Sequence, residues 1–434
     1  MVGKWRDTTL GDLVDFVSGG TPSKGNAAYW NGAIPWVSAK DMKRFLLDDA
    51  EDHITESGLS NGTRLAPTRA VLLLTRGMTL LNDIPICVAQ RPMAFNQDVK
   101  ALRPKGQITD SFIPYLLLGN KSRLLNLVDL AGHGTGRLNT DELKSLDVRL
   151  PPENEQRAIA HILGTLDDKI ELNRRMNETL EAMARALFQS WFVDFDPVRA
   201  KMEGRWCQGE SLPGPPAHLY DLFPDSFEES ELGEIPRGWG VKSIYDIADV
   251  VYGAPFSSSQ FNLDRNGRPL IRIRDLPGER PQIWTPEIHL KAYMVRPGDI
   301  VVGMDGEFRA YLWGGDEAWL NQRVCVFVPK KECSAAFVRN SIIGPLADIE
   351  ETETATTVIH LGKSDIDRFT AVVPSAAVLA AFNHICQPWY DRVVATKRES
   401  RTITYVRDGL LPRLISGDIR LNEVQHLVEA TMVR

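Results

Sequence analysis

Apolar residues recur at alternating steps of three and four through one long stretch, from Glu153 to Phe195, which follows Pro151 and Pro152. The recurring positions are Ile159, Ile162, Leu166, Lys169, Asn173, Met176, Leu180, Met183 and Leu187. This spacing is typical of the seam of a coiled coil, where polar residues such as Lys169 and Asn173 fix register at some cost in stability. The stretch predicts a helix on the order of 65 Å long, at about 1.5 Å per residue.

A second helix is expected from Ser375 to about Asp408. Its apolar side carries Val378, Phe382, Ile385, Trp389, Val393 and Ile403. Pro388 is expected to kink it, because proline lacks a backbone donor and crowds the preceding turn. An ordinary core helix is the alternative for each stretch, but their length and their duplication favour two helices that pair with each other.

Short runs rich in β-forming residues precede each helical stretch, separated by glycine, proline and asparagine turns. They are Ala70 to Thr75, Val99 to Leu102, Ile300 to Val302 and Val324 to Val328. A short helix is expected around Phe112 to Leu118. The mixture predicts α/β globules of the mixed α+β kind.

An internal repeat relates the two halves of the chain. Trp5 and Trp239 are 234 residues apart, as are Asp12 and Asp246, whereas Pro151 matches Pro374 at 223. Further matches are residues 35–42 with 269–276, and Asn96-Gln97 with Asn321-Gln322. The repeat divides the chain into a globular domain (1–152), a helical region (153–202), a linker (203–236), a second globular domain (237–374) and a second helical region (375–425). A pseudo-two-fold arrangement is expected, because each copy runs on into a helix.

The linker, 203–236, is rich in proline and glycine, and its residues 205–236 hold seven acidic side chains against one arginine. It is expected to be an extended, solvated connection. Much of the formal net charge of −7 therefore lies in one short segment. The global charge says little about what the remaining surface binds.

Composition narrows the class of protein. Of 434 residues, 43% are hydrophobic and 25% charged, which is usual for globular proteins and excludes intrinsic disorder. No apolar run is long enough to cross a bilayer and no signal peptide is recognisable, so a cytoplasmic protein without membrane contact is expected. The five cysteines have no C-x-x-C spacing, which argues against a disulfide framework or a zinc site.

Motifs of intrinsic catalysis are missing or incomplete. Gly362-Lys363-Ser364 has the end of a P-loop, but Thr357 stands where its first glycine belongs. The glycine-rich run 132–136 does not lead from a strand into a helix as a dinucleotide site requires. No catalytic residue and no metal ligand is therefore expected, and the duplicated domains are expected to bind rather than to catalyse.

Several strings resemble the specificity (S) subunit of type I restriction-modification systems, and the resemblance covers nearly the whole chain. The strings are 187–198 (LFQSWFVDFDPV), 223–227 (FPDSF), 233–239 (GEIPRGW), 407–412 (RDGLLP) and 416–419 (SGDI). The resemblance implies that the globular segments are two target recognition domains, each similar to the DNA-reading domain of adenine-N6 methyltransferases. It also implies that the two helical regions pack antiparallel as a coiled coil.

The same resemblance implies the partners: double-stranded DNA, two modification (M) subunits and restriction (R) subunits. It implies that the chain itself binds no cofactor, since S-adenosylmethionine, ATP and Mg²⁺ belong to the partner subunits. An antiparallel helix pair would place the two domains at its opposite ends, each facing a DNA groove. A bipartite, asymmetric DNA target with an unread spacer is the expected consequence.

The two halves of an asymmetric target differ, so residues that read bases should differ between the copies. Asn96, Gln97, Asn321 and Gln322, which the copies share, are therefore expected to bond locally at turns or strand ends. Asp41 and Asp275 are expected to be turn or cap acceptors. Lys40 and Arg274 keep only their charge, which suits a contact to DNA phosphate.

Divergent polar loop residues are the stronger candidates for reading DNA. In the first copy they are Thr21, Ser23, Lys24, Lys43, Arg44, Arg76, His133, Thr135 and Arg137. In the second they are Ser257, Ser258, Ser259, Gln260, Arg272, Arg309, Thr357 and His360. Arg137 and Arg272 are favoured, because a guanidinium fork can bond guanine O6 and N7. A solvated loop side chain is the alternative for each.

Two other classes of function stay open. One is a self-contained, divergent DNA methyltransferase or nuclease, which assays of the purified chain would reveal. The other is a scaffold that binds protein rather than DNA, against which salt-sensitive DNA binding would argue.

Overall fold

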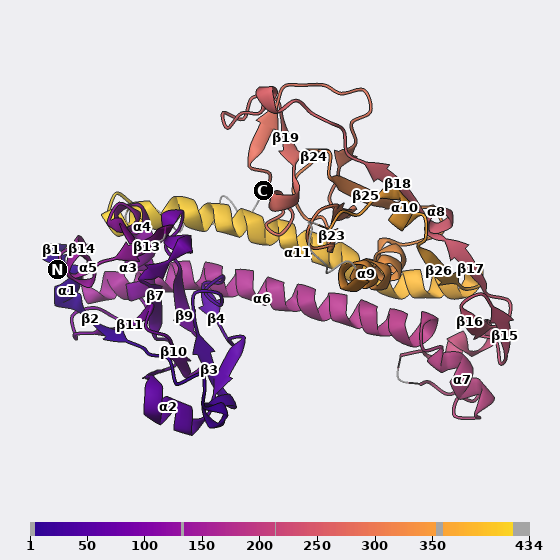
Figure 1. The fold of residues 1–434 in the computed structure, drawn as a ribbon, viewed down its shortest axis with the longest axis horizontal. Helices are drawn as coiled ribbons and strands as arrows, with labels where there is room; N and C mark the ends of the chain where they lie inside the picture. The colour runs from indigo at the N-terminus through magenta and orange to yellow at the C-terminus, as the bar shows by residue number, and fades with distance from the viewer. Residues whose placement is uncertain (1–4, 132–133, 213, 353–358, 420–434) are drawn as a thin grey trace. The chain divides into compact units, whose positions relative to one another are not determined.

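The computed structural model describes residues 5–131, 134–212, 214–352 and 359–419 (Figure 1). The chain forms two compact units, residues 1–171 with 402–434 and residues 172–401. Both boundaries fall inside long helices, α6 (Glu153–Phe192) and α11 (Ala376–Ser416). Both predicted helices are thus confirmed, and α11 continues through Pro388 without a break.

The first unit contains two main sheets. One has strand order β2-β11-β7-β9-β4 and the other β5-β3-β10-β6. Their bounds are β2 (Val14–Ser18), β3 (Trp30–Val37), β4 (Leu46–Leu47), β5 (Asp52–Ile54), β6 (Leu65–Ala66), β7 (Val71–Leu74), β9 (Ile86–Ala89), β10 (Met93–Phe95) and β11 (Val99–Pro104). Strand β7 is buried at every residue, which is why its sequence is a continuous apolar run.

Smaller elements complete the first unit. They are the pair β1 (Arg6–Thr9) and β14 (Asp147–Leu150), a sheet of β12 (Val128–Ala131), β13 (Thr135–Leu138) and β8 (Arg76–Gly77), and the helices α1 (Leu10–Leu13), α2 (Glu56–Gly62), α3 (Ile113–Gly119), α4 (Lys121–Leu125) and α5 (Thr140–Lys144). The predicted helix around Phe112 is α3. Its buried residues join those of the sheets and of both long helices in one apolar core.

The second unit repeats this plan. Its main sheets have the orders β18-β25-β22-β23 and β20-β19-β24-β21, and β17 pairs with β26. The bounds are β17 (Gly240–Ser243), β18 (Ala248–Tyr252), β19 (Arg268–Ile271), β20 (Ile283–Thr285), β21 (Met294–Val295), β22 (Ile300–Gly303), β23 (Ala310–Leu312), β24 (Ala318–Leu320), β25 (Val324–Pro329) and β26 (Thr370–Val373), with helices α8 (Ile244–Ile247), α9 (Ala335–Thr352) and α10 (Lys363–Ile366).

Strand pairing confirms the internal repeat. Strand β10 runs parallel to β3 in the first domain, and β24 runs parallel to β19 at the equivalent place in the second. In both domains the outer neighbours of this parallel pair are antiparallel to it. The chain therefore contains one mixed α/β domain built twice, as the sequence predicts.

Contacts between α6 and α11 show that the helices are antiparallel. In the second unit Asn173 Nδ2 lies 3.2 Å from Ser400 Oγ, and Thr396 donates a hydrogen bond to Asn177. These two contacts are related by the repeat, because each α11 residue follows its α6 counterpart by 223 positions. Asn173 and Thr396, which are both buried, therefore occupy equivalent positions on the two helices.

The buried row of α6 corrects the predicted seam at alternate positions. Ile159, Leu166, Asn173 and Leu187 are buried as expected. At three other positions the residue after the predicted one is buried, namely Leu163, Asn177 and Ala184 after Ile162, Met176 and Met183; Ala160 and Asp167 are buried as well. Met183 is 45% exposed. The buried face of α6 is therefore offset by one residue at these three positions.

The linker is folded, which corrects the expectation of an extended, solvated segment. Helix α7 (Asp196–Met202) lies just before it, and the linker itself contains a 3-10 turn at Ala217–Leu222 and a hairpin of β15 (Phe227–Ser230) and β16 (Gly233–Pro236). Trp206 and Phe223 are buried against Trp191 and Phe192 at the end of α6. Aromatic burial outweighs the proline, glycine and acidic content that suggested a solvated chain.

Candidate nucleic-acid interface

Four of the shared residues, Asp41, Asp275, Asn96 and Asn321, form local hydrogen bonds, as predicted, whereas the Gln97 side chain accepts a bond from the distant Thr21. Asp41 Oδ2 accepts from the backbone N–H of Ser38 at 2.8 Å, and Asp275 Oδ2 from that of Arg272 at 3.0 Å. Asn96 Oδ1 accepts from the Asp98 N–H at 3.0 Å. Asn321 Oδ1 accepts from the next backbone N–H at 2.9 Å. These side chains hold turns and strand ends.

Gly19 and Gly253 allow a close approach of two backbone segments within each domain. A Cβ at Gly19 would lie 2.1 Å from the Phe95 carbonyl oxygen, and one at Gly253 would lie 1.9 Å from that of Asn321. The missing side chain of Gly19 thus makes room for the domain's own strand end.

The two expected phosphate contacts differ in their surroundings. Lys40 Nζ lies 2.9 Å from Asp52 and 3.0 Å from Glu51, and the two carboxylates raise its pKa. Arg274 is exposed and forms no hydrogen bond or ion pair with a described residue. Arg274 is therefore freer to contact a phosphate than Lys40.

Most loop candidates are exposed, and several form hydrogen bonds with other residues of their own domain. Thr21 donates to Gln97 Oε1 at 2.6 Å, Ser257 Oγ lies 2.8 Å from Ser259 Oγ, and the Ser257 N–H donates to Glu287. The remaining exposed loop candidates are Ser23, Lys24, Lys43, Arg44, Ser258 and Gln260. His133 and Thr357 lie outside the described residues. Contact of these loops with DNA stays a prediction.

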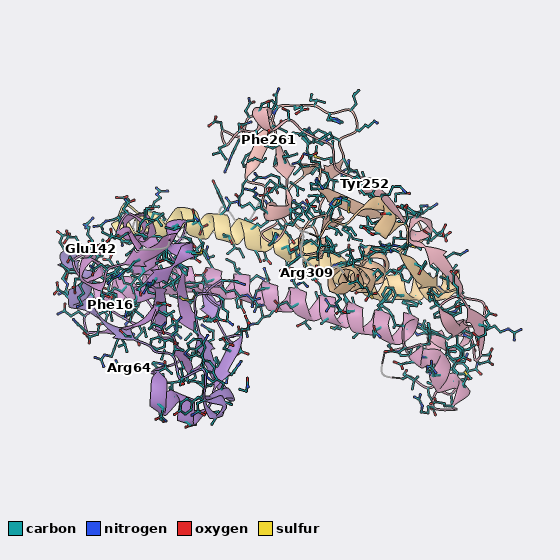
Figure 2. The ribbon with its side chains drawn as sticks, viewed as in Figure 1. Phe16, Arg64, Glu142, Tyr252, Phe261 and Arg309 are labelled. Atoms are coloured by element: carbon teal, nitrogen blue, oxygen red, sulfur yellow. The ribbon has the colours of Figure 1, made fainter. Side chains whose placement is uncertain are left out.

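Arg272, one of the two favoured residues, is held by its own domain. Its Nε lies 3.2 Å from Asp275 Oδ2, and its side chain is 20% exposed while that of Asp275 is fully buried. Arg309, labelled in Figure 2, is more open, with an ion pair to Glu307 at 3.5 Å and 61% of its side chain exposed. A role for Arg272 in reading DNA would require release of this ion pair.

Arg76 and Arg137, which are distant in sequence, lie directly opposite each other. They are register partners in the antiparallel pair β8 and β13, which places their side chains on one face. Both are exposed, and neither forms an ion pair with a described residue. Thr135 lies in the same strand as Arg137. We call the pair Arg76 and Arg137 the first junction.

His360 occupies the equivalent place in the second domain, opposite Asp305. Its Nδ1 lies 2.7 Å from Asp305 Oδ1 and 3.1 Å from Arg323 Nη1. We call Asp305, His360 and Arg323 the second junction. The sequence singled out His360 but missed Asp305 and Arg323, although counting onward from the matched strands would have aligned Asp305 with Arg76.

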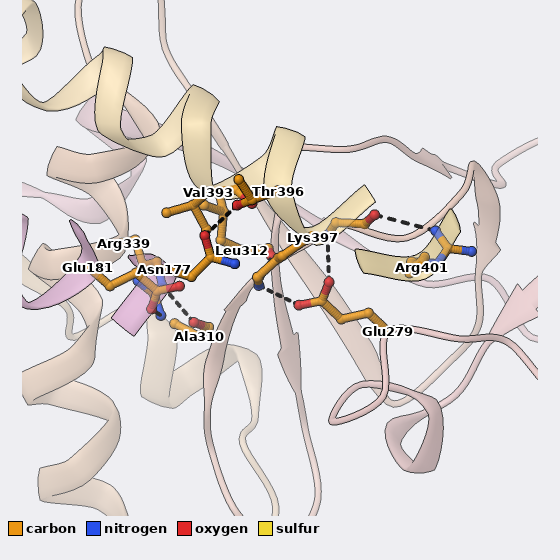
Figure 3. A network of polar contacts seen from close by, with 11 residues as sticks. Asn177, Glu181, Glu279, Ala310, Leu312, Arg339, Val393, Thr396, Lys397 and Arg401 are labelled. Atoms are coloured by element: carbon orange, nitrogen blue, oxygen red, sulfur yellow. Dashed lines mark hydrogen bonds and ion pairs between the residues drawn. The ribbon is translucent and has the colours of Figure 1, made fainter. Parts of the chain in front are cut away.

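Polar contacts fix the strands beside Arg309 to the long helices (Figure 3). Arg339 of α9 donates to the Ala310 carbonyl at 2.7 Å and to Glu181 of α6 at 2.8 Å. Lys397 of α11 donates to Glu279 and, at 2.8 Å, to the Leu312 carbonyl. The strand that follows Arg309 is therefore held to both long helices by hydrogen bonds and ion pairs.

Other classes of site find little support among the described residues. No group of three or more His, Cys, Asp and Glu side chains could hold a metal ion, and no helix there could span a membrane. A hollow of about 440 Å³ in the first unit is lined by none of the DNA-binding candidates. The described cysteines are all free, and Cys207 is exposed.

The chain thus has two copies of one mixed α/β domain. Each copy packs against residues of both long, antiparallel helices. Residues 3–182 match the family model described as the type I restriction modification DNA specificity domain. Over nearly its whole length the chain is also similar to a type I restriction enzyme specificity subunit.

Relatives match over different lengths. The MjaIX specificity subunit of Methanocaldococcus jannaschii is 26% identical, over 97% of this chain and 94% of the relative. The EcoR124I/EcoR124II specificity subunit of Escherichia coli is 34% identical over 38% of this chain and 41% of the relative. A type I S subunit structure from M. genitalium has a TM-score of 0.56 at 15% identity, covering 95% of this chain and 96% of that one, and supports the fold.

Proposed function

We propose that this chain supplies the DNA sequence specificity of a type I restriction-modification complex by binding a bipartite, asymmetric duplex target. One observation carries the proposal: the same scaffold is built twice, and its two junctions carry unlike polar side chains. A protein that reads two different half-sites needs this combination of a shared frame and divergent contacts. The similarity to the MjaIX specificity subunit, which extends over nearly the full chain, supports the same assignment.

Catalysis belongs to partner subunits in this proposal. Two modification subunits would dock on the chain and methylate adenine with S-adenosylmethionine, and restriction subunits would add ATP- and Mg²⁺-dependent activity. The chain would itself bind none of these cofactors. The incomplete P-loop at 362–364 and the lack of other catalytic motifs support this division of roles.

Mapping of N6-methyladenine tests the proposal directly. The full chain is expressed with its modification subunits in cells that lack both, and methylated sites are surveyed across the genome. We expect one motif with two unlike halves and a fixed spacer, which disappears when the chain is omitted. A motif with a single half, or methyl transfer by the purified chain alone, would contradict the proposal.

The helix pair sets the spacer in this proposal, which adds a second measurement. Because α6 and α11 are antiparallel partners, seven residues must be inserted into both to keep their contacts in register. The motif should then keep its halves and gain a longer spacer. Insertion into α6 alone serves as the control and should disrupt the pair.

A further inference from the structure

The two junctions occupy the same position in the two domains, as backbone hydrogen bonds establish independently of sequence matching. The Leu138 N–H donates to the Thr75 carbonyl at 2.9 Å, next to the first junction. The Leu361 N–H donates to the Met304 carbonyl at 2.8 Å, next to the second. Arg76 therefore corresponds to Asp305, and Arg137 corresponds to His360.

A third position belongs to the same site. The Thr75 N–H donates to the carbonyl of Asp98, and the Met304 N–H donates to that of Arg323. Arg323 therefore stands where the first domain has Asp98. All three positions differ in chemistry, whereas Asn96 and Asn321, two residues earlier, are identical.

The first junction places two like charges opposite each other. Arg76 and Arg137 are directly opposite in an antiparallel pair, where like charges repel. Arg137 also lies opposite Asp129 on the neighbouring strand β12, but neither arginine forms an ion pair with a residue that the structure describes. The paired glycines at 77 and 136 face the inside, where a Cβ at Gly136 would lie 2.8 Å from Leu80. The guanidinium groups are thus presented outward, ready for an external acceptor.

The second junction presents an acceptor that is already oriented. Asp305 Oδ1 lies 2.7 Å from His360 Nδ1 and 3.5 Å from Arg323 Nη1. Its other oxygen, Oδ2, forms no hydrogen bond with a residue that the structure describes. The carboxylate side chain is 28% exposed, so this oxygen can accept a bond from outside the protein.

We infer that the junction is the base-reading element of each domain and that its three positions determine the two halves of the target. In the first domain the guanidinium forks of Arg76 and Arg137 donate to guanine O6 and N7 in the major groove. In the second domain Asp305 accepts from a cytosine N4 amino group, with His360 and Arg323 as positioning residues for the carboxylate. This inference rests on the proposed function and adds the residues and the base class.

Conservative variants in the complete complex test the inference. Arg137→Lys keeps the charge but loses the bidentate fork, and Asp305→Asn keeps the shape but loses the negative charge. Arg64→Lys and Asp264→Asn are matched controls in exposed loops of the same domains. Each variant is expressed with the modification subunits, and its methylation motif and its affinity for duplexes changed at one base pair are measured.

We expect Arg137→Lys to relax one position of one half-site and Asp305→Asn to relax one position of the other. Discrimination at that position should fall about tenfold to hundredfold, with the controls unchanged. If Arg137→Lys leaves the motif unaltered, Arg137 does not read a base and the inference is overturned. Equal weakening on all sequences would also overturn it, because that result indicates a phosphate contact instead. Relaxation of both halves by one variant would also overturn it.

Failure of the inference and failure of the proposed function are distinguishable. If the wild-type complex methylates no bipartite motif, the proposed function is wrong. If the wild-type motif is bipartite and neither junction variant changes a single position of it, only the inference is wrong. Co-purification of each variant with its modification subunits confirms that it is folded.

Discussion

Thr9 and Asp12 cap the first helix of the first domain in the same way that Ser243 and Asp246 cap the first helix of the second. Arg76 and Arg137, by contrast, occupy positions that Asp305 and His360 fill in the other copy. The agreement concerns residues that satisfy the domain's own backbone, and the difference concerns residues that face outward. The comparison thus separates side chains that hold the fold from those available to a ligand.

The contacts between each domain and the long helices show a second kind of difference. In the first unit Asp167 of α6 bonds Tyr115 of α3 at 3.0 Å and Arg407 of α11 at 2.5 Å. In the second unit Tyr390, the repeat counterpart of Asp167, contacts Arg339 of α9 at 3.3 Å. Both units thus have a buried polar contact between a long helix and a helix of the domain, but the chemical groups that form it differ. This is expected if the site requires only that its buried polar groups be paired.

The ends of the helices differ in packing. Trp191 and Phe192 close the α6 end with a cluster of rings, whereas their repeat counterparts Leu414 and Ile415 close the α11 end with aliphatic side chains. Only the α6 end is followed by the linker, and the rings bury Phe223 of that segment. The aromatic cluster therefore attaches the linker.

Removal of Arg407 should give the largest effect. Arg407→Ala leaves the Asp167 carboxyl, which is 4% exposed, without its cationic partner, and loss of one member of a buried pair costs about 3–5 kcal/mol. Burial already raises the pKa of Asp167, with Arg407 opposing the shift. The raised pKa favours the protonated carboxyl in the folded state, so the variant's stability should fall as pH rises above about 4, where the unfolded carboxyl ionises.

The second unit supplies the comparison for this variant. Arg339→Ala leaves Glu181, whose side chain is 20% exposed and can be solvated, so its loss should depend less on pH. Urea unfolding at pH 5 and pH 8 measures both variants, with the exposed Arg392→Ala on α11 as the control. Equal pH dependence for Arg407→Ala and Arg339→Ala would refute the contrast.

Trp191→Leu should have an intermediate effect. The change gives the α6 end the residue that the repeat has at Leu414, and the unfilled volume should cost about 2 kcal/mol. Because Trp191 packs on Phe223, the linker should be released, and protease cleavage within 203–236 should become faster. Phe223→Leu should produce the same release. A linker that stays protected in both variants would show that other contacts attach it.

The apolar spacing and the repeat predict the two long helices, the buried strands and the duplicated domain. Three seam positions were wrong by one residue. Spacing alone cannot choose between the adjacent apolar residues Ile162 and Leu163, and the buried Asn177 and Ala184 are less apolar than the neighbouring methionines that the pattern selected. The linker was misjudged because Trp206 and Phe223 are two aromatic residues in a segment dominated by proline, glycine and acid. A few buried rings decide its structure.

The candidate site was predicted only in part, for a different reason. Arg76 and Arg137 were each singled out, but their pairing depends on strand register, which sequence does not give. Arg272 was favoured for its fork, whereas the structure pairs that fork with Asp275 three residues away. Asp305 and Arg323 were missed because their role emerges only when backbone hydrogen bonds align the copies.

The capping boxes should give the smallest and most equal effects. Thr9→Ala and Ser243→Ala each remove a side-chain oxygen that accepts a backbone N–H at the start of a short helix, which typically costs about 1 kcal/mol. Hydrogen bonds from Thr9 hold the pKa of Asp12 below its ordinary value, so Thr9→Ala should let that pKa rise in an NMR titration. Thr9→Ser keeps the hydroxyl and should restore both stability and pKa. Unequal losses in the two domains would show that the copies have diverged in their frame as well as at their surface.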